Sequence, residues 1–367
     1  MREASGLLAE LAPQVQANCA IADASVAGRF SLCGLLLRLR NLYKWERGLP
    51  PWQEQETSQV LEWVSQREQL WDEVLEKQPQ PLVLNGESFD PFAVEQINQI
   101  LASHGLLYGA GRVGGGAPVF FLAHEEKAWR QDGLWVHRLG QELTSDILFL
   151  PGLRQGGDIF LRRGPFPYLL WDLLADPRPS QTAFKRFALE AYGRDYRQVT
   201  TRPSWEQLAP VLEGEMQAVL WHELGEARDA APAQELLALA AAQHPGSDVE
   251  HFVRGVKDLM ADCGPQGRLA QIAAHQSLGA LGLYPVWQAG FLRLLFPEII
   301  PAVQGFMAQG DWDIIEQARL TGWRKARGAA RDLQEILAGY QGAEARTLVR
   351  RVVMEPLVGL AASQAQD

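Results

Sequence analysis

Residues 211–229 read VLEGEMQAVLWHELGEARD and hold the densest set of potential metal ligands in the chain. Glu215, His222, Glu226 and Asp229 follow one another at intervals of seven, four and three residues. Because an α-helix turns by about 100° per residue, these four side chains fall on one stripe of a helix. The stretch therefore predicts a helix of a mostly helical domain, with a polar stripe that is the first candidate site.

Apolar residues border this stripe, and the helix is mixed on all sides. Leu212 and Val219 lie next to the stripe, whereas Glu213 lies among the leucines of the opposite face. Both faces are therefore expected to be covered by protein. Burying carboxylates and an imidazole costs free energy unless they are paired or bind a cation.

We therefore expect a metal site formed by Glu215, His222 and Glu226, with His275 as the added ligand from a later helix. His275 is chosen because it lies at the edge of an apolar helix face. Carboxylates with one or two imidazoles suit a divalent transition metal, iron, manganese or zinc. The alternative is a solvated polar face or an ion-pair network, which the same residues would also form.

The sequence HELGE at residues 222–226 is not a metalloprotease motif. A zinc protease helix would carry a second histidine four residues after the first, and here that position is Glu226. The metal hypothesis therefore does not extend to a protease.

A second candidate is the glycine-rich stretch from Gly109 to Gly116, which reads GAGRVGGG. In a dinucleotide-binding fold, such a motif follows a strand and opens a helix. Here it is followed by the strand-like residues 118–123, so a hairpin turn is the expected structure. A nucleotide or phosphate binder that uses this loop and Arg112 remains an alternative function.

A third candidate is a small separate site on a predicted hairpin. His124, Glu125 and His137 could approach one another across a turn near residues 131–133, which read QDG.

Composition narrows the class of protein. The 367 residues carry a formal net charge of −10, which argues against a general nucleic-acid binder or a protein attracted to anionic membranes. The three cysteines are widely spaced, and the first residues lack the apolar core of a signal peptide. Residues 278–307 are apolar but are interrupted by prolines and charges, which does not suit a membrane span. We expect a cytoplasmic protein with free thiols.

The predicted fold is α+β and predominantly α-helical. Residues 1–80 form an N-terminal helical region, residues 81–170 a small α+β region with short antiparallel strands, and residues 171–367 a helical, bundle-like domain that carries the metal site. Periodicity, caps and breakers define the individual elements. Helices are expected over residues 4–20, 32–46, 53–77, 248–263, 268–283 and 311–340, and strands over residues 106–108, 119–123, 134–139, 147–150 and 159–162.

Two classes of function remain open beside the phosphate binder. The first is a metal-dependent hydrolase or oxidase that acts on a small molecule, with the metal activating water or dioxygen. The second is a non-catalytic interaction or scaffold protein, favoured by the 12 tryptophans and by the lack of a complete catalytic set.

Overall fold

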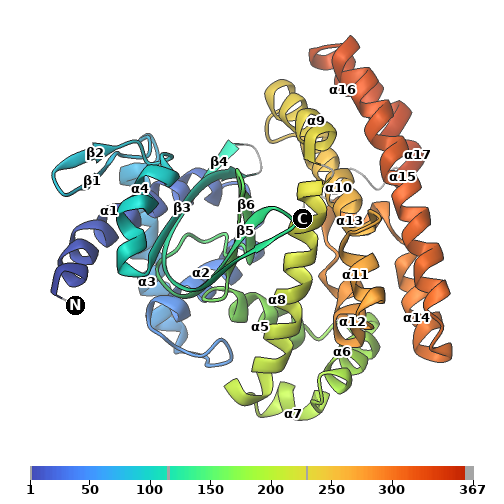
Figure 1. The fold of residues 1–367 in the computed structure, drawn as a ribbon, viewed down its shortest axis with the longest axis horizontal. Coiled ribbons are helices and arrows are strands. Elements are labelled where there is room, and N and C mark those ends of the chain that lie inside the picture. The colour runs from blue at the N-terminus through green and yellow to red at the C-terminus, as the bar shows by residue number, and fades with distance from the viewer. Residues whose placement is uncertain (1, 114–115, 229, 360–367) are drawn as a thin grey trace. The chain divides into compact units, whose positions relative to one another are not determined.

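The computed structural model describes residues 2–113, 116–228 and 230–359, which form two compact units. Unit 1 comprises residues 1–172 and unit 2 residues 173–367. Strands occur only between residues 82 and 162 of the described chain, and the rest of its regular structure is helical (Figure 1). The predicted α+β, predominantly helical fold is confirmed. The predicted boundaries near residues 80 and 170 stay predictions.

A five-stranded sheet with the order β3-β4-β5-β7-β6 forms the centre of unit 1. Its strands are β3 (Leu106–Val113), β4 (Ala117–Gln131), β5 (Leu134–Thr144), β6 (Gly152–Gln155) and β7 (Asp158–Arg162). Strands β3, β4 and β5 pair antiparallel in sequence order, but β5 pairs parallel with β7. The predicted antiparallel strands are thus present, together with one parallel pair that the sequence did not indicate. A separate hairpin joins β1 (Leu82–Leu84) and β2 (Glu87–Phe89).

Side chains alternate between the two faces of the sheet, as the pleat requires. Phe120 packs with α1 (Arg2–Ala27) and α4 (Val94–Leu101) in one core. Its neighbour Phe121 packs on the opposite face with Leu139 and Phe160. Part of residues 1–80 thus shares a hydrophobic core with the sheet.

The helices of unit 1 follow local sequence signals. The predicted helix over residues 32–46 is α2 (Leu32–Glu46), and Ser31 caps it, since its hydroxyl accepts a hydrogen bond from the backbone N–H of Gly34. Pro13 lies inside α1, which continues past the predicted end near residue 20 to Ala27. The other helices of unit 1 are α3 (Thr57–Val74) and the short η1 (Ala102–His104), while α5 (Phe166–Ala175) runs across the boundary.

The strand predicted over residues 147–150 was wrong. The backbone N–H groups that a strand would use are taken by carboxylates: Ile147 donates to Asp23 and Leu148 to Asp146. Phe149 has a positive φ of 51°, which a strand does not allow. The segment is therefore a bend held by buried aspartates.

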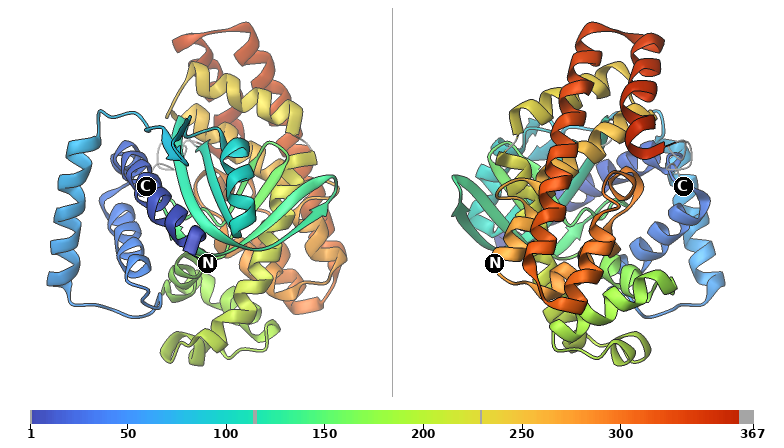
Figure 2. Two further views of the ribbon diagram at one scale, coloured as in Figure 1. Left: turned by 60° about the vertical axis from the view of Figure 1, so that its left-hand side comes forward. Right: turned by 90° about the vertical axis from the view of Figure 1, so that its right-hand side faces the viewer.

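Unit 2 consists of helices that surround α10 (Asp248–Cys263). Of the 16 residues of α10, 12 are buried, so it is the core helix of this unit. The long helix α15 (Trp312–Gly339), orange-red in Figure 2, packs against it. The remaining helices of unit 2 are α6 (Pro179–Ala191), α7 (Tyr196–Thr201), α8 (Trp205–Arg228), α9 (Ala230–Gln243), α11 (Arg268–Ala274), α12 (Leu278–Trp287), α13 (Gly290–Leu295), α14 (Ile299–Gln309), α16 (Gly342–Leu348), η3 (Val349–Met354) and α17 (Glu355–Val358).

The predicted helix over residues 268–283 is divided into α11 and α12, because Gln276 adopts a positive φ of 50° between them.

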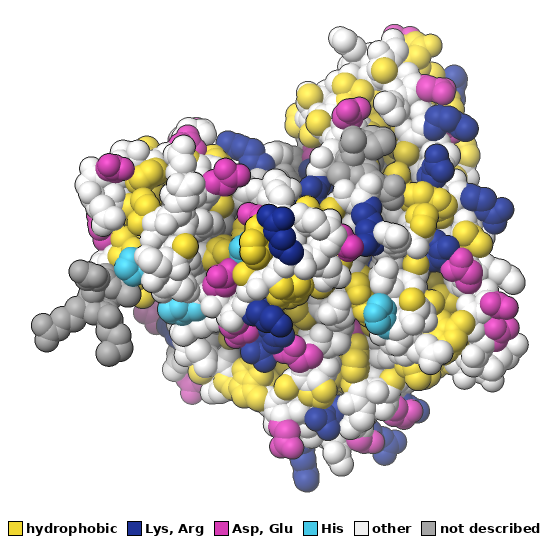
Figure 3. All heavy atoms as spheres, in the orientation of Figure 1, with side chains coloured by type: hydrophobic (Ala, Val, Ile, Leu, Met, Phe, Trp, Pro, Cys, Tyr) yellow, Lys and Arg dark blue, Asp and Glu magenta, His cyan; other side chains and the backbone are white. Residues whose placement is uncertain are grey.

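Among the described residues, no helix combines the length and the apolar character needed to cross a membrane. The described residues on the face in Figure 3 show acidic and basic side chains interspersed rather than separated.

Candidate metal centre

Helices α8 and α10 approach each other closely at Gly225. A Cβ atom at this position would lie 2.3 Å from the backbone oxygen of Ala261, so only glycine fits. Gly225 lies between His222 and Glu226 on α8, and Ala261 is next to Asp262 on α10. The close crossing therefore brings the polar stripe of α8 against carboxylates of α10.

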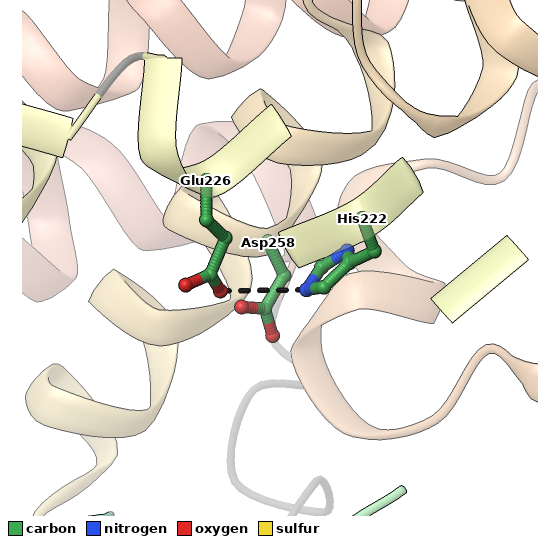
Figure 4. A group of neighbouring side chains, drawn as sticks. All are labelled: His222, Glu226 and Asp258. Atoms are coloured by element: carbon green, nitrogen blue, oxygen red, sulfur yellow. Dashed lines mark ion pairs between the residues drawn. The ribbon is translucent and has the colours of Figure 1, made fainter. Parts of the chain in front are cut away.

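His222, Glu226 and Asp258 form the cluster at this crossing. Figure 4 shows the three side chains pointing toward one another, the first two from α8 and the third from α10. One ligand atom of each lies within 4.8 Å of the others. Metal–ligand bonds of about 2.0–2.2 Å put two ligand atoms of one ion within about 4.4 Å of each other. Small side-chain movements would therefore bring all three ligand atoms within bonding distance of a single ion.

Both ring nitrogens of His222 face carboxylates. Nδ1 donates to Oδ1 of Asp262 at 2.8 Å, and Nε2 lies 3.3 Å from Oε1 of Glu226. Asp262 is buried and accepts a second hydrogen bond, from the Tyr284 hydroxyl at 2.8 Å. The imidazole is thereby held in one orientation, with Nε2 directed at the cluster.

A lysine ammonium also contacts the cluster. Lys257, the neighbour of Asp258 on α10, donates to Glu226, and its Nζ lies 3.9 Å from Oδ1 of Asp258. Side-chain exposure is 17% for Lys257 and 37% for Asp258, so the group opens to solvent at the aspartate. A positive charge thus already lies beside the two carboxylates.

Burial and the neighbouring charges shift the pKa values of the three side chains in the cluster. Burial alone would lower the pKa of His222, but the carboxylates of Asp262 and Glu226 raise it well above the usual value. Burial opposes the ionisation of Glu226, yet the hydrogen bonds from His222 and Lys257 lower its pKa well below the usual range. Partial burial raises the pKa of Asp258 to about 6. The cluster is an alternating set of positive and negative groups.

Glu215 lies on the same helix but has different partners. Its carboxylate is fully buried and accepts hydrogen bonds from the Tyr192 hydroxyl at 2.8 Å and from Nε1 of Trp287 at 2.6 Å. Arg268 lies 3.7 Å from it, and burial raises the pKa of Glu215 to about 6. The structure does not bring Glu215 into the cluster, because these groups already satisfy its oxygens.

His275 is likewise not brought to the cluster. It is exposed just after α11, its Nδ1 donates to the backbone oxygen of Gln271, and its ring stacks on Trp221 at 5.1 Å. Of the predicted ligands, the structure thus brings together His222 and Glu226, while Asp229 lies outside the described residues.

Sequence reasoning missed Asp258 and Asp262. The two aspartates are four residues apart on α10 and share a helix face. That spacing was the available signal. It could not show that the face lies against α8.

The glycine-rich stretch forms the end of a hairpin in its described residues. Gly109 and Gly111 lie in β3, and a Cβ at Gly109 would lie 2.0 Å from the ring of Phe121. Arg112 donates to the backbone oxygen of Gly116. Packing thus accounts for Gly109, and residues 114–115 lie outside the described part of the chain.

The third candidate site, predicted from His124, Glu125 and His137, is formed only in part. Nδ1 of His137 contacts Oε1 of Glu125 at 2.5 Å. His124 does not join them, because in the strand register it is paired with Leu106 while His137 is opposite Ala128.

Comparisons with known protein families also divide the chain into two parts, as the two compact units of the structure do. Residues 10–162 match the N-terminal domain, and residues 167–356 the C-terminal domain, of a family of unknown function, DUF6866. The chain belongs to the DUF6866 family. No curated protein and no solved structure matches it. The His222 cluster lies within the stretch that matches the DUF6866 C-terminal domain.

Proposed function

We propose that this protein binds a divalent transition-metal ion through His222, Glu226 and Asp258. The orientation of His222 carries the proposal, because one nitrogen is fixed by Asp262 while the other faces the cluster. Histidines that bind metals commonly donate their second ring N–H to a carboxylate, which orients the ring and increases its basicity. Tyr284 in turn holds Asp262.

The ligand set is suited to reactive chemistry rather than to a closed structural site. One imidazole and two carboxylates suit iron, manganese or zinc, and three protein ligands leave coordination positions open. The partly exposed Asp258 gives an ion access from solvent. We therefore infer a metal-dependent enzyme, a hydrolase or oxidase of a small molecule, in which the ion would bind water or dioxygen.

Lys257 favours a second candidate function, a non-catalytic helical scaffold. Its ammonium supplies positive charge to Glu226 and lies near Asp258, as a metal ion would. In this alternative the cluster is an ion-pair network that fastens α8 to α10. The two candidates make opposite predictions about the lysine, since it competes with a metal in the first and completes the network in the second.

Replacement of the lysine separates the candidates. We expect Lys257→Met to bind manganese or zinc about tenfold more tightly than the unaltered protein, because removing one competing charge is worth about 1.4 kcal/mol. Affinity is measured by titration calorimetry on metal-free protein, and bound metal by elemental analysis after desalting. If Lys257→Met binds no metal and only melts at a lower temperature, the ion-pair network is the better account.

Ligand variants complete the experiment. His222→Gln and Asp258→Asn are expected to lose the bound ion. His275→Gln is the matched control, because this histidine belongs to the same unit but lies exposed outside the cluster. Metal binding that survives His222→Gln but is lost in His275→Gln would contradict the proposed ligand set.

A further inference from the structure

Unit 1 contains a cavity of about 510 Å³ between α4 and the strands β3, β4, β5 and β7. Its lining includes the apolar residues Leu106, Leu107 and Phe160 and the indole of Trp135. This volume is in the range of sites for small organic ligands. The cavity is independent of the proposed metal site, which belongs to unit 2.

The charged groups that line this cavity are mainly carboxylates. They are Glu95 from α4, Glu125 from β4 and Asp158 from β7, and among the described lining residues there is one further ionisable group, His137. Lysine and arginine are absent from the described lining. Even a protonated His137 would leave three negative charges against one positive charge, so the cavity favours a cation.

His137 lies between two of these carboxylates. Nδ1 of His137 contacts Oε1 of Glu125 at 2.5 Å, and Nε2 lies 3.8 Å from Oδ1 of Asp158. Its ring stacks on Phe160 with a centroid distance of 5.4 Å. Glu125 is therefore held by the histidine, and both acidic groups belong to strands of the sheet.

A second cavity of about 350 Å³ adjoins the first and shares four lining residues with it. The amide oxygen Oε1 of Gln155, which lines this second cavity, is buried and has no hydrogen-bond partner among the described residues. Because this oxygen is closed off from solvent, a ligand N–H could satisfy it only after the side chain turns toward the cavity. Both cavities are thus lined by the carboxylates of Glu95 and Asp158 next to the aromatic ring of Phe160.

We infer that this pair of cavities binds an organic cation, a primary amine attached to an apolar or aromatic body. The ammonium would donate to Asp158 or Glu95, and the body would pack on Phe160 and Leu107. The guanidinium of Arg130 lies 5.1 Å from the centroid of Trp135, so this ring already has a cationic partner, and the ammonium is expected at the carboxylates instead.

Three indole compounds of nearly equal shape test the inference on the full chain. Tryptamine is cationic, tryptophol is neutral and indole-3-acetate is anionic. In titration calorimetry at low salt we expect tryptamine to bind at least about tenfold more tightly than the other two, as one charge-assisted contact would give. Equal binding of all three, or binding of none, would overturn the inference.

Variants locate the binding site. Asp158→Asn and Glu95→Gln are each expected to weaken tryptamine about three- to tenfold and to leave tryptophol unchanged. Glu95 is exposed, so its replacement does not put folding at risk. Glu87→Gln on β2 is the control, because it removes the same charge from an exposed residue outside both cavities. Unchanged tryptamine affinity in both cavity variants would place the binding elsewhere and refute the proposal.

Discussion

At the scale of single residues, Gly225 decides whether the candidate metal centre can form. Its Cβ position is 2.3 Å from the Ala261 backbone oxygen, which cannot move without moving α10. We expect Gly225→Ala to force the helices apart and to lower the free energy of unfolding by about 1–3 kcal/mol. Denaturation followed by circular dichroism measures the loss, and the same variant is expected to bind less metal.

Gly328 provides the matched control for this prediction. It lies inside the helix α15 of the same unit, and a Cβ there would meet nothing within 4 Å. Gly328→Ala is therefore expected to stabilise the protein by about 0.5–1 kcal/mol, as alanine does in helices. If Gly225→Ala stabilises the protein to a similar degree, the two helices are not in close contact at this point.

At the scale of elements, Asp262 links α8, α10 and α12. It accepts from His222 of α8 and from Tyr284 of α12 while lying on α10. We expect Asp262→Asn to lower metal affinity about 10- to 100-fold, which is typical when a carboxylate that orients a metal-binding histidine is lost. Calorimetric titration of zinc into metal-free variant and parent measures the change.

Asp248→Asn is the control for Asp262→Asn. Asp248 is also a buried aspartate of α10, but its carboxylate pairs with Arg346 and Arg350. We expect this variant to change stability without changing metal affinity. A similar drop in affinity for both variants would mean that α10 is perturbed as a whole.

The elements could be predicted where the signal is local. Ser31 marks the start of α2, and the apolar period of residues 248–263 gives both ends of α10. The positions of Asp258 and Asp262 could not be predicted in this way. Their environment depends on the crossing with α8, and nothing within α10 shows which of its polar residues meets another helix.

The same reasoning explains why the predictions for residues 147–150 and for Glu215 differ from the structure. Residues 147–150 are apolar like a strand, but distant carboxylates take their backbone N–H groups. Glu215 and His222 share a helix stripe, yet Glu215 is bonded by Trp287 of α12 and His222 by Asp262 of α10. A stripe on one helix thus predicts which side chains point together, and the packing decides which of them meet.

At the scale of the whole molecule, a buried pair of aspartates in unit 1 makes stability depend on pH. Asp23 and Asp146 are both almost fully buried, and Asp146 accepts from the backbone N–H of Phe120. Burial first, and then the charge of Asp146, raise the pKa of Asp23 well above its usual value of 3.8. Burial likewise raises the pKa of Asp146.

The sign of the pH effect follows from these raised pKa values. A carboxyl group with a higher pKa in the folded state binds its proton more tightly there. Its contribution to the free energy of unfolding is therefore largest below about pH 4 and is lost as the pH rises through the folded-state pKa. Asp23→Asn mimics the protonated form and can still accept from Ile147. The variant is therefore expected to gain stability relative to the parent as pH increases, on the order of 1 kcal/mol or more at pH 8.

Thermal unfolding between pH 4 and pH 8 measures this difference. Asp72→Asn is the control, because Asp72 is exposed on α3 and its replacement changes the net charge by the same amount. General charge repulsion in a chain of net charge −10 would make both variants gain stability equally. Burial of the pair instead predicts that the pH-dependent gain is confined to Asp23→Asn, and a gain that is the same at all pH values would contradict the raised pKa.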